Sequence, residues 1–121
     1  MGGSGVNDPA LITTADFARR AVARGCQLKD GFDGIVTTAA TLGTVIDLAE
    51  ELSLVVLGLD GFNLDGAEVV PMIDFIADFS SVVGDWAKRV DLCAAAAREL
   101  QAHWQPSPDL IEVTLDGFGN E

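Results

Sequence analysis

The run Leu54-Val-Val-Leu-Gly-Leu59 is the strongest indication of how this chain folds, because it is apolar at every position. A strand that is apolar on both faces belongs in the middle of a sheet that is covered on both sides. A second run, Leu110-Ile-Glu-Val-Thr-Leu115, alternates between apolar and polar residues. This pattern predicts a half-buried strand over 110–116 whose carboxylates point outward.

Three segments have the apolar periodicity of helices. Residues 12–24 open with a capping pattern, Thr13-x-x-Asp16, and end before Gly25. A second helix is expected over about 38–52, after a turn-rich connection at 29–36. The third spans 83–104, where apolar residues recur at spacings of three and four: Val83, Trp86, Val90, Cys93, Ala97, Leu100 and Trp104. Such a seam packs against a sheet or against a second copy of the chain, and its small central residues favour the sheet.

The segment between the first strand and the last helix contains two Asp-Gly turn signals, within residues 60–66. Residues 67–70 are expected to return as a strand. Pro71 then suits the start of a short helix through Phe79, although residues 73–79 also alternate as a strand does. Together these patterns predict an α+β fold, in which three helices pack on a small sheet with central strand 54–59 and strand 110–116. We expect one globular domain over 11–118 and a flexible leader over 1–10.

Acidic residues are concentrated in one part of the chain. From Asp30 to Ala87, a stretch of 58 positions, there are eleven Asp and Glu residues and no Lys, Arg or His, and the whole chain has a formal net charge of -12. A surface of one sign repels nucleic acid and anionic membranes and attracts basic proteins. Acidity also serves solubility, but a solubilising surface usually mixes the two signs. No apolar run reaches the ~18 residues that a membrane-spanning helix needs.

The residues that carry chemistry in enzymes are scarce. The chain has one histidine, His103, and two cysteines, Cys26 and Cys93. It contains none of the nucleophile, phosphate-binding or dinucleotide-binding motifs, so we expect neither catalytic residues nor a cofactor. Two cysteines and no signal segment are typical of a reduced, cytoplasmic protein. Cys93 lies on the apolar seam and is expected to be inert, whereas Cys26 follows a helix end and is the more exposed candidate.

The stretch Val55-Val-Leu-Gly-Leu-Asp-Gly-Phe62, the segment Pro71–Ser80, the Trp86 to Cys93 helix and the strand 111–115 resemble small bacterial immunity proteins of toxin–immunity systems. The resemblance covers roughly residues 50–118 and none of 12–50. It implies a cytoplasmic inhibitor that occupies a cognate toxin domain, and it transfers no catalytic residues.

The favoured interpretation is therefore a binding protein for a basic partner, such as a toxin nuclease. Its expected contact residues are carboxylates and two aromatic anchors: Asp60, Asp65, Glu68, Glu112, Asp116, Phe62 and Phe118. Core packing is the alternative role for each phenylalanine. A second interpretation is a metal-dependent hydrolase built from four strand-end acids: Asp60, Asp65, Glu112 and Asp116. A third is a homodimeric structural subunit joined through the 83–104 seam.

Overall fold

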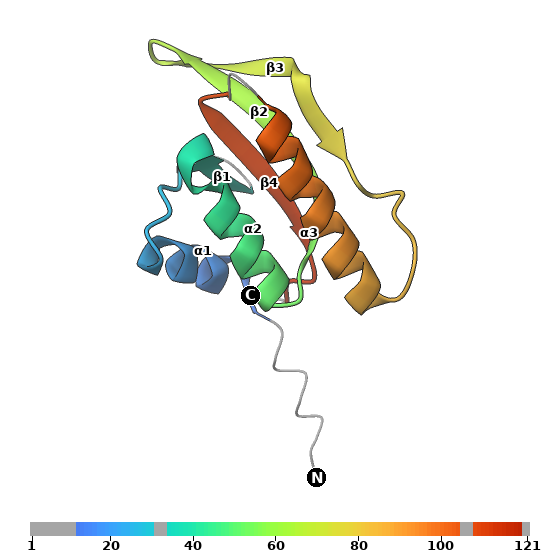
Figure 1. The fold of residues 1–121 in the computed structure, drawn as a ribbon. Helices are drawn as coiled ribbons and strands as arrows, with labels where there is room; N and C mark the ends of the chain where they lie inside the picture. Colours follow the sequence, from blue (N-terminus) through green and yellow to red (C-terminus); the bar gives the residue numbers. More distant parts are fainter. Residues whose placement is uncertain (1–11, 31–33, 105–107, 120–121) are drawn as a thin grey trace.

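The computed structural model describes residues 12–30, 34–104 and 108–119, which form three α-helices and one four-stranded antiparallel sheet (Figure 1). The α+β fold class is thus confirmed. The expected leader over residues 1–10 lies outside the described residues. The elements are α1 Thr14–Ala23, β1 Ile35–Thr38, α2 Leu42–Glu51, β2 Val55–Asp65, β3 Glu68–Asp78, α3 Trp86–His103 and β4 Leu110–Asp116, with a short 3-10 helix, η2 Ala39–Thr41, before α2.

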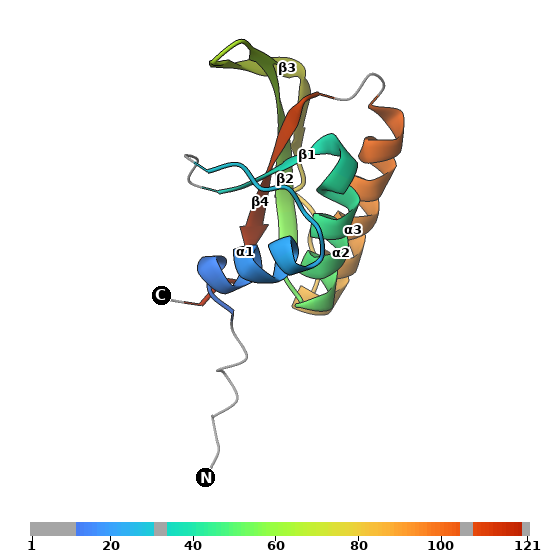
Figure 2. The same ribbon diagram turned by 90° about the vertical axis from the view of Figure 1, so that its left-hand side faces the viewer.

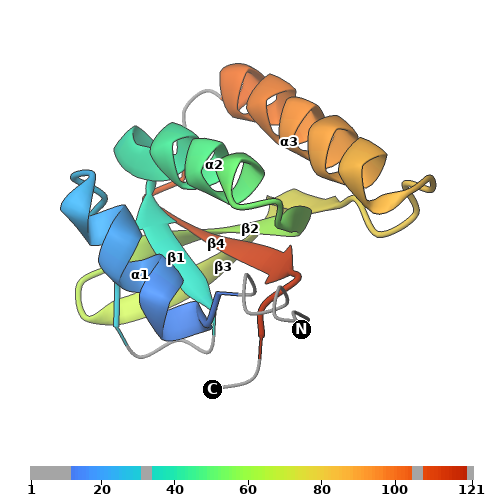
Figure 3. The same ribbon diagram turned by 90° about the horizontal axis from the view of Figure 1, so that it is seen from below.

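The strands lie in the order β1-β4-β2-β3, so β2 and β4 are central and β1 and β3 are the edges. Helices α2 and α3 pack side by side on one face of the sheet, and α1 crosses its lower end near β1 (Figures 2 and 3). The first half of β2 is buried, as its apolar sequence predicts, and the burial fades toward Asp65. The expectation that both faces of this strand are covered is wrong from Gly58 onward, where the face opposite α2 and α3 is open. The buried side chains form one contiguous core between the helices and the sheet.

Helix α1 begins where its capping pattern predicts. The Thr13 hydroxyl accepts a hydrogen bond from the Asp16 backbone N–H at 3.1 Å, which satisfies one of the free donors of the first turn. The apolar residues Phe17, Ala21 and Val22 have the spacing of one helix stripe, yet Phe17 and Ala21 are completely buried and Val22 is 56% exposed. The apolar stripe of α1 is therefore narrower than its sequence indicates.

The apolar seam of α3 faces the sheet of its own chain. Val90, Cys93 and Ala97 are buried, and the Trp104 ring packs edge-on against Phe75 with 5.2 Å between centroids. Val83 lies before the helix and is exposed. Because the centre of the seam is already buried in one chain, it cannot also serve as the dimer interface considered above.

The segment after the hairpin turn is a strand, so the expected helix from Pro71 to Phe79 is wrong. Residues 68–78 form β3, which pairs with β2 through Pro71 and again from Ile76 to Asp78. Between these two stretches the register shifts, which matches a bulge in an edge strand. Edge strands tolerate proline because one side of the backbone makes no ladder hydrogen bonds. The alternation over 73–79 was the correct signal.

Two further expectations fail at strand β1 and at Asp60. Residues 35–38 were expected to belong to a turn and a helix start, but they pair with β4 at the sheet edge. Asp60-Gly61 lies inside β2 and not in a turn. Glycine suits position 61 there because a side chain would collide with Phe75 and Pro108. Only the second Asp-Gly pair turns the chain: Gly66, with φ of 64°, is the first of two turn residues, where hairpins favour glycine.

Candidate functional site

The charges of this protein are divided between its strands and its helices. The strands carry seven carboxylates and no basic residue: Asp60, Asp65, Glu68, Asp74, Asp78, Glu112 and Asp116. All seven Lys and Arg residues lie in α1, in α3 or in the segment that follows α1. The sheet is therefore the acidic part of the molecule, although the sequence spreads these residues over 57 positions.

Ion pairs neutralise most of the acids in the helix layer. Arg24 donates two hydrogen bonds of 2.8 Å to the Glu51 carboxylate. Arg98 contacts both Asp47 and Glu50, at 2.7 and 2.6 Å. A further pair joins Arg19 to Asp16 within α1. These contacts are exposed and contribute little to stability, but they cancel charge locally.

The pKa directions agree with this pairing. The hydrogen bond that Arg24 donates to Glu51 lowers the pKa of Glu51, and the hydrogen bonds that Arg98 donates to Asp47 and Glu50 raise the pKa of Arg98. Within the described ranges, Asp60, Asp65 and Asp116 form no ion pair. The charge of these three carboxylates therefore remains available to an external cation.

The face of the sheet opposite α2 and α3 carries the central acids. Asp60 on β2 lies directly opposite Glu112 on β4. Because side chains alternate along a strand, Asp60 shares its face with every second residue of β4 and with its partners on β3. We call this surface the open face and define it by nine residues: Asp60, Phe62, Leu64, Val69, Ile76, Asp78, Glu112, Thr114 and Asp116.

A shallow hollow of about 280 Å³ lies on the open face above Gly58. Asp60, Asp78, Ile76 and Thr114 surround it. Hydrogen bonds from the hydroxyl and the backbone N–H of Ser80 lower the pKa of Asp78, which keeps this carboxylate ionised. A hollow of this size between two carboxylates suits a single Lys or Arg side chain of a partner.

The structure brings together only some of the expected contact residues. Asp60, Phe62 and Glu112 are neighbours at the centre of the open face. Asp65 and Glu68 face each other at the hairpin end, while Asp116 pairs with Val55 at the opposite end of β2, roughly 33 Å away along the strand. The seven residues therefore do not form one continuous patch.

Phe118 is packed within the chain. Its ring meets the buried Phe17 edge-on, with 5.9 Å between centroids. The core-packing alternative is therefore correct for this residue, and Phe118 is not a free anchor. Phe62 is half-buried on the open face, opposite Leu110.

The four acids of the metal-site interpretation are likewise separated along β2 and β4. In the part of the chain that the structure describes, no group of three or more His, Cys, Asp or Glu side chains is placed to hold a metal ion. Cys26 and Cys93 are free thiols and both are buried, with Cys26 at 5% and Cys93 at 0% exposure, so Cys26 is only marginally the more exposed of the two. Burial raises the pKa of both thiols, which makes them poor nucleophiles at neutral pH.

Sequence reasoning missed the apolar part of this surface. Five large apolar side chains of the β2–β3 hairpin and of β3 are exposed, which are Leu64 at 45%, Val69 at 36%, Val70 at 41%, Ile73 at 80% and Ile76 at 58%. The alternation over 73–79 was the available signal, but the helix expected from Pro71 obscured it. Three of them, Leu64, Val69 and Ile76, lie on the open face and extend its acidic surface with apolar contact area.

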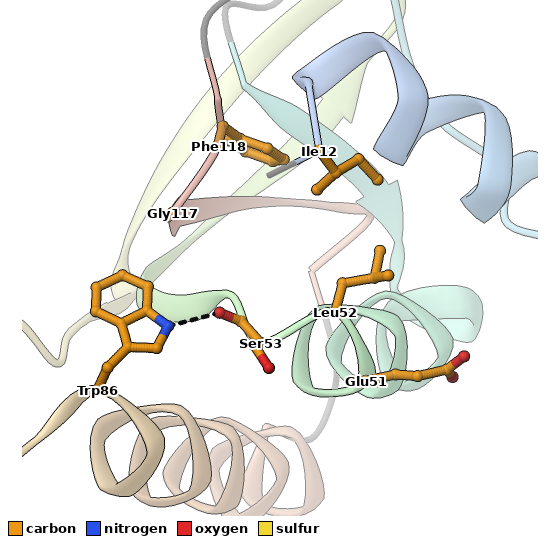
Figure 4. A pocket seen from close by; sticks show the side chains of 7 residues that line it. All are labelled: Ile12, Glu51, Leu52, Ser53, Trp86, Gly117 and Phe118. Atoms are coloured by element: carbon orange, nitrogen blue, oxygen red, sulfur yellow. Dashed lines mark hydrogen bonds between the residues drawn. The ribbon is translucent and has the colours of Figure 1, made fainter. Parts of the chain in front are cut away.

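A larger pocket of about 650 Å³ opens at the end of the sheet near α1. Ile12, Leu52, Trp86 and Phe118 line it with apolar atoms (Figure 4). The indole Nε1 of Trp86 donates a hydrogen bond of 2.7 Å to the backbone oxygen of Ser53, which fixes the ring at the pocket wall. Among the described residues that line it, most are apolar, and the charged side chain of Glu51 is paired with Arg24. This lining suits an apolar group of a bound molecule.

The two carboxylates that lie opposite each other at the centre of the open face, Asp60 and Glu112, are expected to lower the stability of the fold. Like charges directly opposite each other on neighbouring strands repel, so Asp60→Asn is expected to raise the free energy of unfolding by a few tenths of a kcal/mol, and by at most about 1 kcal/mol. Asp116→Asn is the control, because it removes the same charge opposite Val55. Urea unfolding at low and high salt measures both variants. A loss of stability in Asp60→Asn, or an equal gain in the control, would contradict the repulsion.

Comparison of the chain with protein-family models, curated proteins and solved structures found no match. No helix within the described residues is long and apolar enough to span a membrane. The arguments for function therefore come from the fold and its charge distribution.

Proposed function

We propose that this chain is an acidic binding protein that inhibits a basic partner, in the role of an immunity protein that neutralises a cognate bacterial toxin. The observation that carries the proposal is the division of charge, with seven carboxylates and no base on the strands and with ion pairs in the helix layer. The proposed partner is a protein with a cationic active-site groove, such as a nuclease. The proposed location is the cytoplasm.

Electrostatics explains what such a division of charge achieves. A surface with one sign of charge raises the local concentration of an oppositely charged partner and accelerates association. A nuclease groove is basic because it binds phosphates, and carboxylates on a rigid sheet present negative charge to the same groups. Exposed apolar side chains beside the acids then supply the short-range contacts that hold a complex together.

Solubility alone would not require this arrangement. Acidic residues that only solubilise the protein are effective on any face. Here the helices mix both signs and form internal ion pairs, whereas the strands carry one sign only. The difference between two faces of one small domain supports a binding role for the sheet.

A capture experiment with matched charge variants tests the proposal. The tagged chain is co-expressed with the product of the neighbouring gene and purified at about 50 mM and about 500 mM NaCl, which changes the screening length severalfold. Asp60→Asn with Asp116→Asn removes two charges from the open face. Asp91→Asn with Glu99→Gln removes two charges from exposed positions on α3.

A basic partner is expected to be captured at low salt, and its toxic activity is expected to be suppressed. The open-face double variant should slow its association about tenfold or more, while the α3 double variant should slow it no more than about twofold. Equal effects of the two variants would show that only net charge matters. Normal inhibition by the open-face variant would overturn the proposal.

A further inference from the structure

The two edges of the sheet differ in how they are protected. The outer side of β1 is partly occupied, because Leu28 forms a bridge with Thr37 and the Lys29 N–H donates a 2.8 Å hydrogen bond to the Val36 oxygen. The outer side of β3 pairs with no other strand of the described chain. An unpaired edge presents backbone donors and acceptors to any extended segment that approaches it.

The β2–β3 hairpin makes this edge long and accessible. Strand β4 pairs with β2 only as far as Phe62, so the hairpin projects beyond the rest of the sheet (Figures 1 and 2). Val69, Ile73 and Ile76 of β3 are exposed. A long edge with exposed apolar side chains is a template for strand addition.

The charges on β3 decide which strand can be added. Glu68, Asp74 and Asp78 all lie on this edge strand and are exposed. A second copy of the chain would bring the same carboxylates against them, and each copy has a net charge of -12. Pro71 and the bulge next to it further oppose regular pairing between identical edges. A cationic segment meets attraction where a second copy meets repulsion.

We propose that an extended, lysine- or arginine-bearing segment of the partner adds to the outer edge of β3 as a fifth strand. The proposal rests on the proposed function and specifies how the partner is recognised. An added strand places its side chains beside those of β3, at alternating positions on each face. Its apolar residues would lie on the open face beside Val69 and Ile76, and its basic residues on the other face beside Glu68.

A synthetic eight-residue peptide of alternating lysine and valine is the probe, because it carries the proposed charge and apolar pattern. The matched peptide is N-methylated at every residue, which keeps its charge and removes the backbone donors from both of its edges. Amide NMR and hydrogen exchange of the whole chain are followed during titration at low salt. The first peptide is expected to protect outward-facing amides of residues 68–78 about tenfold or more, and the methylated peptide is expected to leave them unprotected.

Two substitutions separate edge pairing from general attraction. Val70→Lys adds a positive charge on β3 outside the open face, and Leu92→Lys adds the same charge at an exposed position of α3. The first should weaken peptide binding about tenfold, which corresponds to 1.4 kcal/mol, and the second should change it less than about threefold. Sedimentation of the free chain adds a further check, since a dimer with protected β3 amides would assign the edge to a second copy and overturn the inference.

The outcomes also separate this inference from the function on which it rests. If the partner is captured through the open-face carboxylates but no β3 amide is protected by the peptide, the fifth-strand mode is wrong and the inhibitory function stands. If the open-face charge variant has no effect on capture, the function fails, whatever the peptide does. Equal protection by both peptides would overturn the fifth-strand mode alone.

Discussion

Phe17→Ala is expected to lower the free energy of unfolding by about 3–5 kcal/mol, which is typical for removing a buried phenylalanine. Phe17 is completely buried, and it is the largest side chain by which α1 enters the core. Its ring also packs edge-on against Phe118, in the segment that follows β4. The substitution therefore leaves a cavity where an amino-terminal helix meets the carboxyl-terminal end of the described chain.

Urea unfolding followed by circular dichroism measures this effect, and Val22→Ala is the control on the same helix. Val22 is mostly exposed, so its truncation should change stability by no more than about 0.5 kcal/mol. A small domain has a total stability of about 5–15 kcal/mol, so Phe17→Ala removes a large share of it. A loss below about 1 kcal/mol in Phe17→Ala would show that α1 does not pack as described.

Gly58→Ala is expected to destabilise the protein by about 1–3 kcal/mol, the usual range for overpacking. A Cβ at this position would lie 2.7 Å from the backbone oxygen of Ala77. That oxygen belongs to the neighbouring strand, so relief of the collision must separate β2 from β3. Because Gly58 also lies under the hollow between Asp60 and Asp78, the same substitution should disturb the open face.

Gly43→Ala is the matched control, because the same methyl group should there have the opposite effect. Gly43 lies in α2, and a Cβ would make only ordinary contacts with Gln101, at 3.5 Å and beyond. Alanine is favoured over glycine inside a helix by about 0.5–1 kcal/mol, so this variant should be more stable than the parent chain. Thermal and urea unfolding of the two variants side by side measure the expected loss of stability in Gly58→Ala and the expected gain in Gly43→Ala. Destabilisation by Gly43→Ala, or no loss in Gly58→Ala, would contradict the packing around these glycines.

The arrangement at the open face links stability to the proposed function. Asp60 and Glu112 are held opposite each other, where like charges oppose folding. Selection for stability alone would favour a neutral residue at one of these positions. The pair lies at the centre of the face that carries the proposed binding site, so its cost in stability accompanies the proposed attraction for a cation.

Several elements follow from local patterns, because their causes lie within a few residues. The Thr13 cap, the apolar run at 54–59, the alternation at 110–116 and the seam of α3 were predicted and are confirmed. The excess of acid between residues 30 and 87 is likewise a property of the sequence alone. Capping and amphipathic periodicity act between near neighbours, so reading the chain in order recovers them.

Other features were decided only by the packing of distant segments. Residues 35–38 became a strand because β4 pairs with them, and residues 71–78 became one because β2 does. The strand order sets Asp60 opposite Glu112, separates Asp65 from Asp116 and leaves β3 as an open edge. The sequence determined which charges and apolar groups this protein has. Tertiary structure decided which of them share a face, because hydrogen bonds between strands join residues that no local pattern relates.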